Sequence, residues 1–240
     1  MVQVQRSTQR PQPLAQSNRL YDRSINTAER TRRRHDFGLR YPTPFETEIE
    51  AASRDNGLDP ALVYGLVRQE SRFVSDIVSG AGAVGLMQLM PPTARWVARQ
   101  TGADSRPLRL DDPALNVRLG AYYLRYVLGK LDGEPVLAAA AYNAGPGRAQ
   151  AWRGMAPLEG AIYAETIPFN ETRDYVKRVL ANAMFYQARL GSRYVALHDR
   201  LGVVTPRGAA ANIEKSVDSG AESAVAAPDA APADRPEPDR

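Results

Sequence analysis

Apolar residues between Pro44 and about Leu201 recur at the three- and four-residue spacing of helices, and glycine and proline interrupt them at intervals. This spacing predicts one helix after another, because a helix turns the same face to the core every three to four residues. Runs of alternating apolar and polar residues, which favour strands, are lacking, so we expect no substantial sheet and an all-α domain. The predicted helices cover about 44–56, 60–72, 91–101, 113–131, 135–143, 147–153, 158–164 and 171–190.

Local signals mark the starts of two of these helices. Asp59 followed by Pro60 predicts a helix start, because an aspartate side chain caps the first N–H groups and proline fits the first helical position. Asp111 or Asp112 repeats this signal before Pro113. Both helices are therefore expected to begin at a defined residue.

Two further signals concern segments near the borders of the helical region. The segment FGLRYP at 37–42 is predicted to be extended, because a residue that precedes proline is pushed out of the α region. The last long helix is expected to begin with Asn170 or Thr172 as its N-cap, since both side chains can accept a hydrogen bond from the first turn.

The two ends of the chain differ in composition from the middle. Residues 1–20 are polar and interrupted by proline and are expected to be disordered, whereas residues 21–36 favour a charged helix that serves as a solvated face or a linker. After Gly202 large apolar residues almost vanish, and such a segment cannot bury enough surface to offset its ordering entropy. We therefore predict a basic, linker-like arm at 1–36, a helical domain at 37–202 and a disordered tail at 203–240.

The net charge of +4 is unevenly distributed along the 240 residues. Residues 1–40 hold nine arginines against three acidic residues, whereas residues 203–240 hold four basic against seven acidic residues. The middle is close to neutral, so the high pI comes from the N-terminal arm. Nucleic-acid binding is not expected, because a basic patch for that purpose would lie on a folded face rather than in a flank.

The chain has no cysteine and only two histidines, His35 and His198. Disulfides and thiolate metal sites are therefore excluded. Histidines so far apart in sequence offer little material for a zinc site or a Ser-His-Asp triad, and no metal or cofactor is implied. Carboxylate chemistry is what remains for an enzyme.

No stretch is long and apolar enough to span a bilayer, and residues 1–30 lack the apolar centre of a secretory signal. Considered alone, these features favour the cytoplasm.

Glu70 is the strongest candidate for chemistry. It follows the apolar run of its helix and precedes a loop of small residues, SGAGA at 79–83. A carboxylic acid that is partly desolvated there would have a raised pKa, as a general acid near neutral pH requires. The alternative is a helix-end glutamate that pairs with Arg68 or Arg72. Gln88 supports the first interpretation, because an amide within an otherwise apolar turn needs a partner, which a sugar could supply.

Two further segments carry polar side chains next to turns. In AAAAYNAGPG at 138–147, Tyr142 and Asn143 end a helix of small residues. Asn143 either caps that helix or points with Tyr142 into the same cleft as Glu70. Glu165 stands just before an Ile-Pro stop, and helix capping does not account for it.

The order of these segments resembles the catalytic (SLT) domain of the soluble lytic murein transglycosylases, which are related to goose-type lysozymes. The similar motifs are RQESRF at 68–73, SGAGAVGLMQLMP at 79–91, AAYNAGPGR at 140–148 and AETIPFNETRDYVKRVL at 164–180, with RYPTPF at 40–45 resembling the soluble branch. The resemblance covers about 37–190 and implies an α-helical, lysozyme-like fold. It also implies that Glu70 is the single catalytic acid and base.

The implied reaction is non-hydrolytic cleavage of the β-1,4 bond between N-acetylmuramic acid and N-acetylglucosamine in peptidoglycan, which leaves a 1,6-anhydromuramoyl end. No second protein carboxylate is required for it, because the attacking hydroxyl belongs to the substrate. The resemblance implies substrate-binding positions at Ser79, Gln88, Met90, Tyr142, Asn143, Glu165 and Tyr175.

Two alternative functions stay open. One is a muramidase that hydrolyses the same bond, with Glu165 or Asp76 holding the attacking water. The other is a peptidoglycan-binding protein without activity, which would be expected to lack Glu70.

The implied peptidoglycan substrate favours the periplasm, although no signal peptide is visible. Soluble members of the family normally carry a signal peptide and a long helical superhelix before the catalytic domain. We therefore expect this chain to be either a C-terminal fragment of such a protein or the product of a gene model whose start was set too far downstream.

Overall fold

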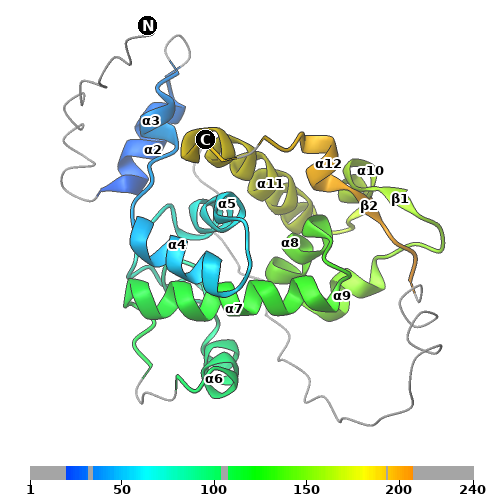
Figure 1. The fold of residues 1–240 in the computed structure, drawn as a ribbon, viewed down its shortest axis with the longest axis horizontal. Helices are drawn as coiled ribbons and strands as arrows, with labels where there is room; N and C mark the ends of the chain where they lie inside the picture. Colours follow the sequence, from blue (N-terminus) through cyan, green and yellow to red (C-terminus); the bar gives the residue numbers. More distant parts are fainter. Residues whose placement is uncertain (1–19, 32–34, 104–107, 193, 208–240) are drawn as a thin grey trace, which may run out of the picture.

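The computed structural model describes residues 20–31, 35–103, 108–192 and 194–207, which are helical apart from loops and two very short strands (Figure 1). The helices in this part of the chain are α2 (Tyr21–Glu29), α3 (Phe37–Arg40), α4 (Glu46–Asp55), α5 (Pro60–Ser71), α6 (Pro91–Gln100), α7 (Pro113–Lys130), α8 (Pro135–Ala144), α9 (Pro146–Ala151), α10 (Gly160–Thr166), α11 (Asn170–Leu190) and α12 (Leu197–Leu201). The strands β1 (Leu158–Glu159) and β2 (Val203–Val204) pair antiparallel. The prediction of an all-α domain is confirmed.

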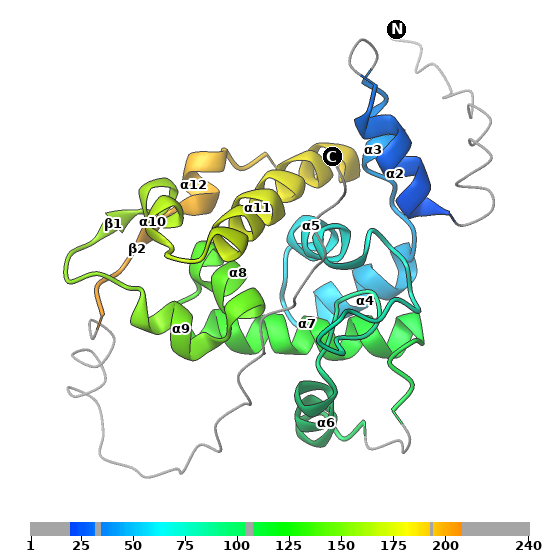
Figure 2. The ribbon, with the colours of Figure 1, turned by 180° about the vertical axis from the view of Figure 1, so that it is seen from behind.

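Helix α5 lies at the centre of the molecule, with α4 packed against one side and α11 against another (Figures 1 and 2). Its most extensive contact is with α11. The two helices approach closely at Gly65, where a Cβ atom would lie 2.8 Å from the carbonyl oxygen of Val179 and 2.8 Å from the amide nitrogen of Ala183. The position of α5 relative to α11 is therefore set by backbone contact as well as by side-chain packing.

The helix-start signals in the sequence are confirmed for the two helices that carry them. The Asp59 carboxylate accepts a hydrogen bond from the amide of Ala61 at 2.9 Å, at the start of α5. The Asp112 carboxylate accepts one from the amide of Leu115 at 2.8 Å, at the start of α7. Of the two aspartates considered for α7, the second is the cap.

Two local predictions were wrong. Residues Phe37–Arg40 form the helical turn α3 instead of an extended segment, because Asp36 caps this turn by accepting from the amide of Leu39 at 3.1 Å. The proline effect reaches only the residue directly before Pro42. Helix α11 begins after Phe169 without a side-chain cap, so neither Asn170 nor Thr172 serves as one.

The segments at the two borders of the domain are better ordered than their composition suggests. Helix α2 buries Ile25 and Ala28, and Ile25 belongs to the hydrophobic core. The predicted tail begins at 203, yet the described chain continues to Arg207 and includes β2. The remaining predicted disordered segments, 1–19 and 208–240, lie outside the described residues.

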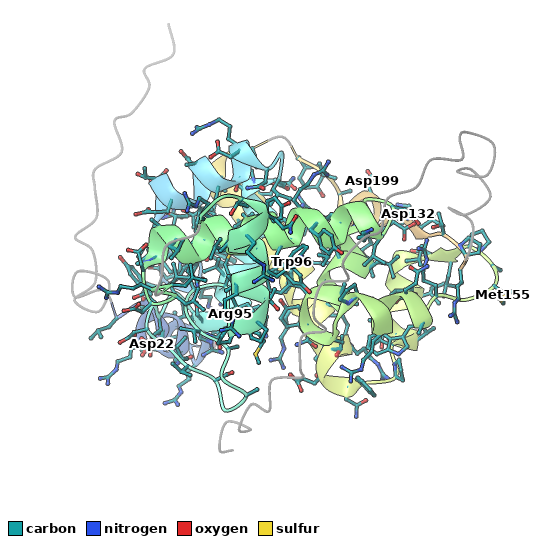
Figure 3. All side chains as sticks on the ribbon, turned by 90° about the horizontal axis from the view of Figure 1, so that it is seen from below. Asp22, Arg95, Trp96, Asp132, Met155 and Asp199 are labelled. Carbon is teal, nitrogen blue, oxygen red and sulfur yellow. The ribbon has the colours of Figure 1, made fainter. Side chains whose placement is uncertain are left out.

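Thr205, the residue that follows β2, is held by side chains from distant parts of the chain, which composition does not reveal. Arg153 donates to the carbonyl of Thr205 at 2.9 Å and forms an ion pair with Asp132 at 2.5 Å. Asp132 marks this end of the molecule in Figure 3, and Met155, which is 88% exposed, projects from it. Helices α2 and α3 lie at the opposite end (Figures 1 and 2). Within the described ranges, no helix has the length and apolar character that a membrane span requires.

Candidate active site

Glu70 lies in the last turn of α5, half-buried, at the point where the helix stops. The helix ends because Arg72 and Phe73 take the left-handed conformation, with φ of 48° and 67°. Such a conformation costs about 1 kcal/mol or more for a residue with a Cβ atom. Phe73 is nevertheless held there, since its ring is buried and its amide donates to the Ser71 hydroxyl at 3.1 Å. The chain therefore turns sharply just after Glu70.

Tyr175 of α11 makes the contact that defines the surroundings of Glu70. Its hydroxyl donates to Glu70 Oε1 at 2.5 Å, across the seam between α5 and α11. Tyr175 is itself buried. A hydroxyl held against a carboxyl oxygen fixes the orientation of the carboxyl group.

The loop that follows α5 is held in shape by its own backbone. Val84 and Leu89 exchange two backbone hydrogen bonds of 3.0 Å each, and the Ser79 hydroxyl accepts from the amide of Ala83 at 2.9 Å. Gln88 donates through Nε2 to the carbonyls of Ile77 at 3.2 Å and Gly85 at 2.8 Å. The protein itself thus supplies hydrogen-bond partners for the amide nitrogen of Gln88.

Asn116 of α7 anchors this loop, and the sequence interpretation missed it. It is buried, its Oδ1 accepts from the amide of Met87 at 2.8 Å, and its Nδ2 donates to the carbonyls of Val84 and Leu110 at 2.9 Å each. Gly85, with φ of +82°, approaches so closely that a Cβ atom would lie 2.3 Å from Asn116 Nδ2. The sequence signal for this role was a polar residue, Asn116, on the apolar face of α7, one helical turn before Gly120.

Tyr142 of α8 also holds this loop. Its hydroxyl donates to the carbonyl of Met87 at 2.9 Å, and the ring is buried. Burial raises the pKa of Tyr142 well above its usual value, and the negative charge of Glu70 raises it further. Tyr142 therefore stays protonated and lies near enough to Glu70 to sense its charge.

Three other predicted site residues are bound to different partners. Asn143 Oδ1 accepts from the Thr172 hydroxyl of α11 at 2.7 Å, which explains why Thr172 does not cap its own helix. Glu165 is exposed and forms an ion pair of 3.2 Å with Lys177, two residues beyond Tyr175. Met90 is half-buried and precedes α6, where its carbonyl accepts from the amide of Ala94 at 2.9 Å.

The arginines on either side of Glu70 both bind a residue that the sequence interpretation did not consider. Arg68 Nη2 lies 2.7 Å from Glu29 Oε1, and Arg72 Nη2 lies 3.5 Å from Glu29 Oε2. Glu29 is the last residue of α2. Glu29 is therefore a carboxylate partner of both arginines, a role for which the sequence interpretation considered only Glu70.

The structure thus brings together Glu70, Tyr175, Tyr142 and the loop that carries Gln88. These side chains come from α5, α11, α8 and the loop between α5 and α6. Among the described side chains, no group of three or more His, Cys, Asp or Glu residues gathers as a metal site. The arrangement offers a carboxyl group fixed by a tyrosine, with backbone and amide groups on the adjoining loop.

Comparison with known proteins gives this arrangement a family context. Residues 47–161 match the family model described as the transglycosylase SLT domain, and residues 166–194 match the model of the soluble lytic transglycosylase helical domain. The soluble lytic murein transglycosylase of Salmonella typhimurium is 35% identical over 164 residues, which is 67% of this chain and 25% of that protein.

Solved structures agree with this family and with the predicted fold. The lytic transglycosylase Slt of Pseudomonas aeruginosa, solved as an inactive glutamate-to-glutamine mutant, superposes with a TM-score of 0.71 at 38% identity and covers 78% of this chain and 31% of its own. The 70 kDa soluble lytic transglycosylase of Escherichia coli gives a TM-score of 0.68 at 28% identity, over 78% of this chain and 30% of its own. The described helices therefore have the lysozyme-like arrangement that the family resemblance implied. This chain spans only about a quarter to a third of the length of these relatives.

Proposed function

Because this chain contains a transglycosylase SLT domain, we propose that it is a lytic murein transglycosylase that cleaves the β-1,4 bond between N-acetylmuramic acid and N-acetylglucosamine in peptidoglycan. The observation that carries the proposal is the half-buried carboxyl group of Glu70, held by the Tyr175 hydroxyl beside a loop of small residues. The inactivity of the Pseudomonas relative after a glutamate-to-glutamine change supports chemistry that depends on a carboxyl group.

In the first step, protonated Glu70 gives its proton to the glycosidic oxygen. The bond between this oxygen and C1 of the muramic acid breaks, and N-acetylglucosamine leaves with a free 4-hydroxyl group. Tyr175 holds Oε1, so the transferred proton is carried by Oε2. The 2-acetamido oxygen of the substrate stabilises the developing positive charge at C1, as in substrate-assisted glycosidases.

In the second step, Glu70 acts as a carboxylate and removes the proton of the C6 hydroxyl group of the same sugar. O6 then forms a bond to C1 and closes the 1,6-anhydro ring, and Glu70 returns to its protonated form. No water is consumed. Since the attacking hydroxyl belongs to the same sugar ring as C1, positioning supplies much of the rate. The Tyr175 hydrogen bond assists the first step, because it stabilises the carboxylate that this step produces, and it holds Glu70 in place for the second.

The other predicted site residues divide into two groups in this proposal. Gln88 Nε2 is engaged by two backbone carbonyls, so its Oε1 is the group that would accept a hydrogen bond from a sugar hydroxyl or acetamide. Ser79, Met90, Asn143 and Glu165 are proposed as glycan contacts on the adjoining surface. Tyr142 is assigned to holding the loop, because its hydroxyl is buried against Met87.

The proposal places the protein in the periplasm, where peptidoglycan lies, and it requires no nucleic acid and no metal. The proteins similar to this chain include both soluble and membrane-bound lytic murein transglycosylases. Protein partners are not part of the proposal.

Digestion of purified sacculi followed by mass spectrometry of the released muropeptides tests this function. The expected products end in anhydromuramic acid and are one water lighter than reducing muropeptides. Reducing ends would instead identify a muramidase, and binding without release would identify a peptidoglycan-binding protein. A Glu70→Gln variant that released muropeptides at a near-normal rate would contradict the assignment of Glu70.

A further inference from the structure

Arg68 is a buried arginine whose guanidinium group joins three parts of the chain two residues before Glu70. Its Nη2 lies 2.7 Å from Glu29 Oε1, its Nε donates to the carbonyl of Arg40 at 2.9 Å, and its Nη1 donates to Asn182 Oδ1 at 3.1 Å. The side chain is 8% exposed. A buried guanidinium needs a carboxylate to balance its charge, and Glu29 provides it.

Glu29 also reaches the arginine on the other side of Glu70. Its second oxygen, Oε2, lies 3.5 Å from Arg72 Nη2. One carboxylate therefore holds both arginines that flank Glu70 in the sequence. Glu29 belongs to α2, which precedes the region that matches the SLT domain model at 47–161.

The contact between Arg68 and Asn182 connects Glu29 to the hydrogen bond between Glu70 and Tyr175. Asn182 lies two helical turns after Tyr175 on α11, so both side chains face α5. Asn182 Nδ2 also donates to the carbonyl of Gly65 at 3.3 Å, where the backbones of the two helices approach closely. Among the described residues, polar links between α5 and α11 thus include those of Asn182 to Arg68 and to the carbonyl of Gly65, and that of Tyr175 to Glu70.

We propose that Glu29 is a positioning residue for Glu70. By balancing and holding Arg68 and Arg72, it fixes the C-terminal end of α5 relative to α11 and thereby sets the geometry of the hydrogen bond between Tyr175 and Glu70. Helix α2 is then part of the functional unit, although it lies outside the matched domain. The proposal rests on the lytic transglycosylase function for its kinetic tests, and one further test is independent of turnover.

The opposite end of the same helix provides a matched control. There Arg200 Nη1 lies 2.7 Å from Asp59 Oδ2, with side-chain exposures of 7% and 37%. The corresponding exposures for Arg68 and Glu29 are 8% and 38%, at the same distance. Glu29→Gln and Asp59→Asn each remove the carboxylate of a buried arginine while keeping the shape of the side chain. Asn is as good an N-cap as Asp, so the start of α5 is preserved.

The first test compares turnover of purified soluble glycan strands by the two variants in the full chain. Both should lower the melting temperature by similar amounts, because both leave a buried arginine unbalanced. Glu29→Gln should lower kcat about 10-fold with KM unchanged, whereas Asp59→Asn should change kcat less than about 2-fold, because only the first disturbs the geometry at Glu70. Equal effects of the two variants on kcat would overturn the proposal.

Two further variants separate positioning from simple loss of stability. Glu29→Asp keeps the carboxylate and should recover part of the lost kcat. In a Tyr175→Phe background, Glu29→Gln should add less than about a 2-fold loss, since the hydrogen bond that Glu29 positions is already absent. If Glu29→Gln lowered kcat by the same factor in the Tyr175→Phe background as in the wild type, the proposal would be contradicted. If Glu29→Gln does not fold, the Glu29→Gln/Arg68→Met double variant, which leaves no buried charge, must show the same kcat loss.

A spectroscopic measurement tests the positioning without any turnover. The carbon-13 resonance of the Tyr175 Cζ atom reports the hydrogen bond of its hydroxyl group. Glu29→Gln should shift this resonance, and Asp59→Asn should leave it in place. A wild-type protein that releases no glycan would overturn the proposed function, whereas an unshifted Tyr175 resonance in Glu29→Gln would overturn the positioning role of Glu29.

Discussion

The two ends of helix α5 have similar ion pairs but different backbones. At the N-terminal end, Asp59 caps the helix in the preferred way, and Pro60 occupies the first helical position. At the C-terminal end, Arg72 and Phe73 adopt the left-handed conformation, and Glu70 is half-buried with a short hydrogen bond to Tyr175. The first end follows the rules for a stable helix and the second departs from them.

We infer that the C-terminal end of α5 gives up local stability for the proposed role of Glu70. Strained backbone and half-buried carboxyl groups persist only where the surrounding structure holds them in place, and such positions concentrate at functional sites. At the C-terminal end of α5 this support comes from α2, α11 and the loop anchored by Asn116. Substitutions at this end should therefore affect turnover, and those at the other end should affect stability.

The largest expected effect is that of Glu70→Gln. The variant keeps the shape of the side chain and removes the proton that Glu70 donates and accepts in the proposed mechanism, so glycan release should fall by about 10³-fold or more. The melting temperature should change little. The matched removal of a charge at the other end, Asp59→Asn, should show the reverse: lower stability and nearly normal release. Equal activity of the two variants would remove the distinction between the ends.

The next effect concerns the close approach of α5 to α11. A Cβ atom at Gly65 would lie 2.8 Å from backbone atoms of Val179 and Ala183, which cannot move aside as a flexible side chain can. Gly65→Ala should therefore lower the free energy of unfolding by about 1–3 kcal/mol and also reduce turnover, because it separates Glu70 from Tyr175. Thermal unfolding and glycan-release rates measure the two effects.

Gly129→Ala is the control for this prediction. Gly129 lies in α7, is exposed and has no atom within 4 Å of the position of an added Cβ. Because alanine favours the helix over glycine, this variant should gain about 0.5–1 kcal/mol without a change in turnover. A Gly65→Ala variant as stable and active as Gly129→Ala would show that the seam between α5 and α11 is not critical.

Tyr175→Phe should have a smaller and more specific effect. It removes the hydroxyl that donates to Glu70 at 2.5 Å, and we expect kcat to fall about 10-fold, equivalent to about 1.4 kcal/mol of barrier. Tyr186→Phe on the same helix is the control, because its buried hydroxyl donates to the carbonyl of Pro42 at 3.0 Å. That variant should lose about 1 kcal/mol of stability and keep its kcat. The same kcat loss in both variants would indicate a general effect of α11.

The smallest effect is expected for Lys177→Ala. Lys177 pairs with Glu165 at 3.2 Å, but the two side chains are 43% and 60% exposed. An exposed ion pair of this kind contributes about 0–1 kcal/mol and is screened by salt. The melting temperature should be nearly unchanged. A loss of stability comparable to that of Asp59→Asn would show that solvent exposure is a poor guide to the importance of ion pairs in this protein.

The sequence predicted those features that depend on short-range signals. The starts of α5 and α7 follow from Asp-Pro pairs, and the place of Glu70 at a helix end followed from the apolar run before it. The segment at 37–40 was mispredicted because the cap formed by Asp36 outweighed the influence of a proline that acts only on its neighbour.

The features that escaped prediction depend on contacts between distant residues. Glu29 and Arg68 are 39 residues apart. Tyr175 was expected to bind substrate, but its contact with Glu70, 105 residues away, was not predicted. A charged side chain has the same local pattern whether it points into solvent or balances a buried arginine. Helix α2 therefore resembled a solvated face, although Ile25 and Ala28 attach it to the core.

Digestion of purified sacculi in water labelled with oxygen-18 tests the proposed mechanism most directly. In that mechanism, Glu70 at the C-terminal end of α5 directs the substrate's own C6 hydroxyl, and not water, to the anomeric carbon. The prediction is that mass spectrometry finds anhydromuramoyl ends without label, one water lighter than reducing ends, and none of them with Glu70→Gln. Reducing ends that carry oxygen-18 would contradict this mechanism.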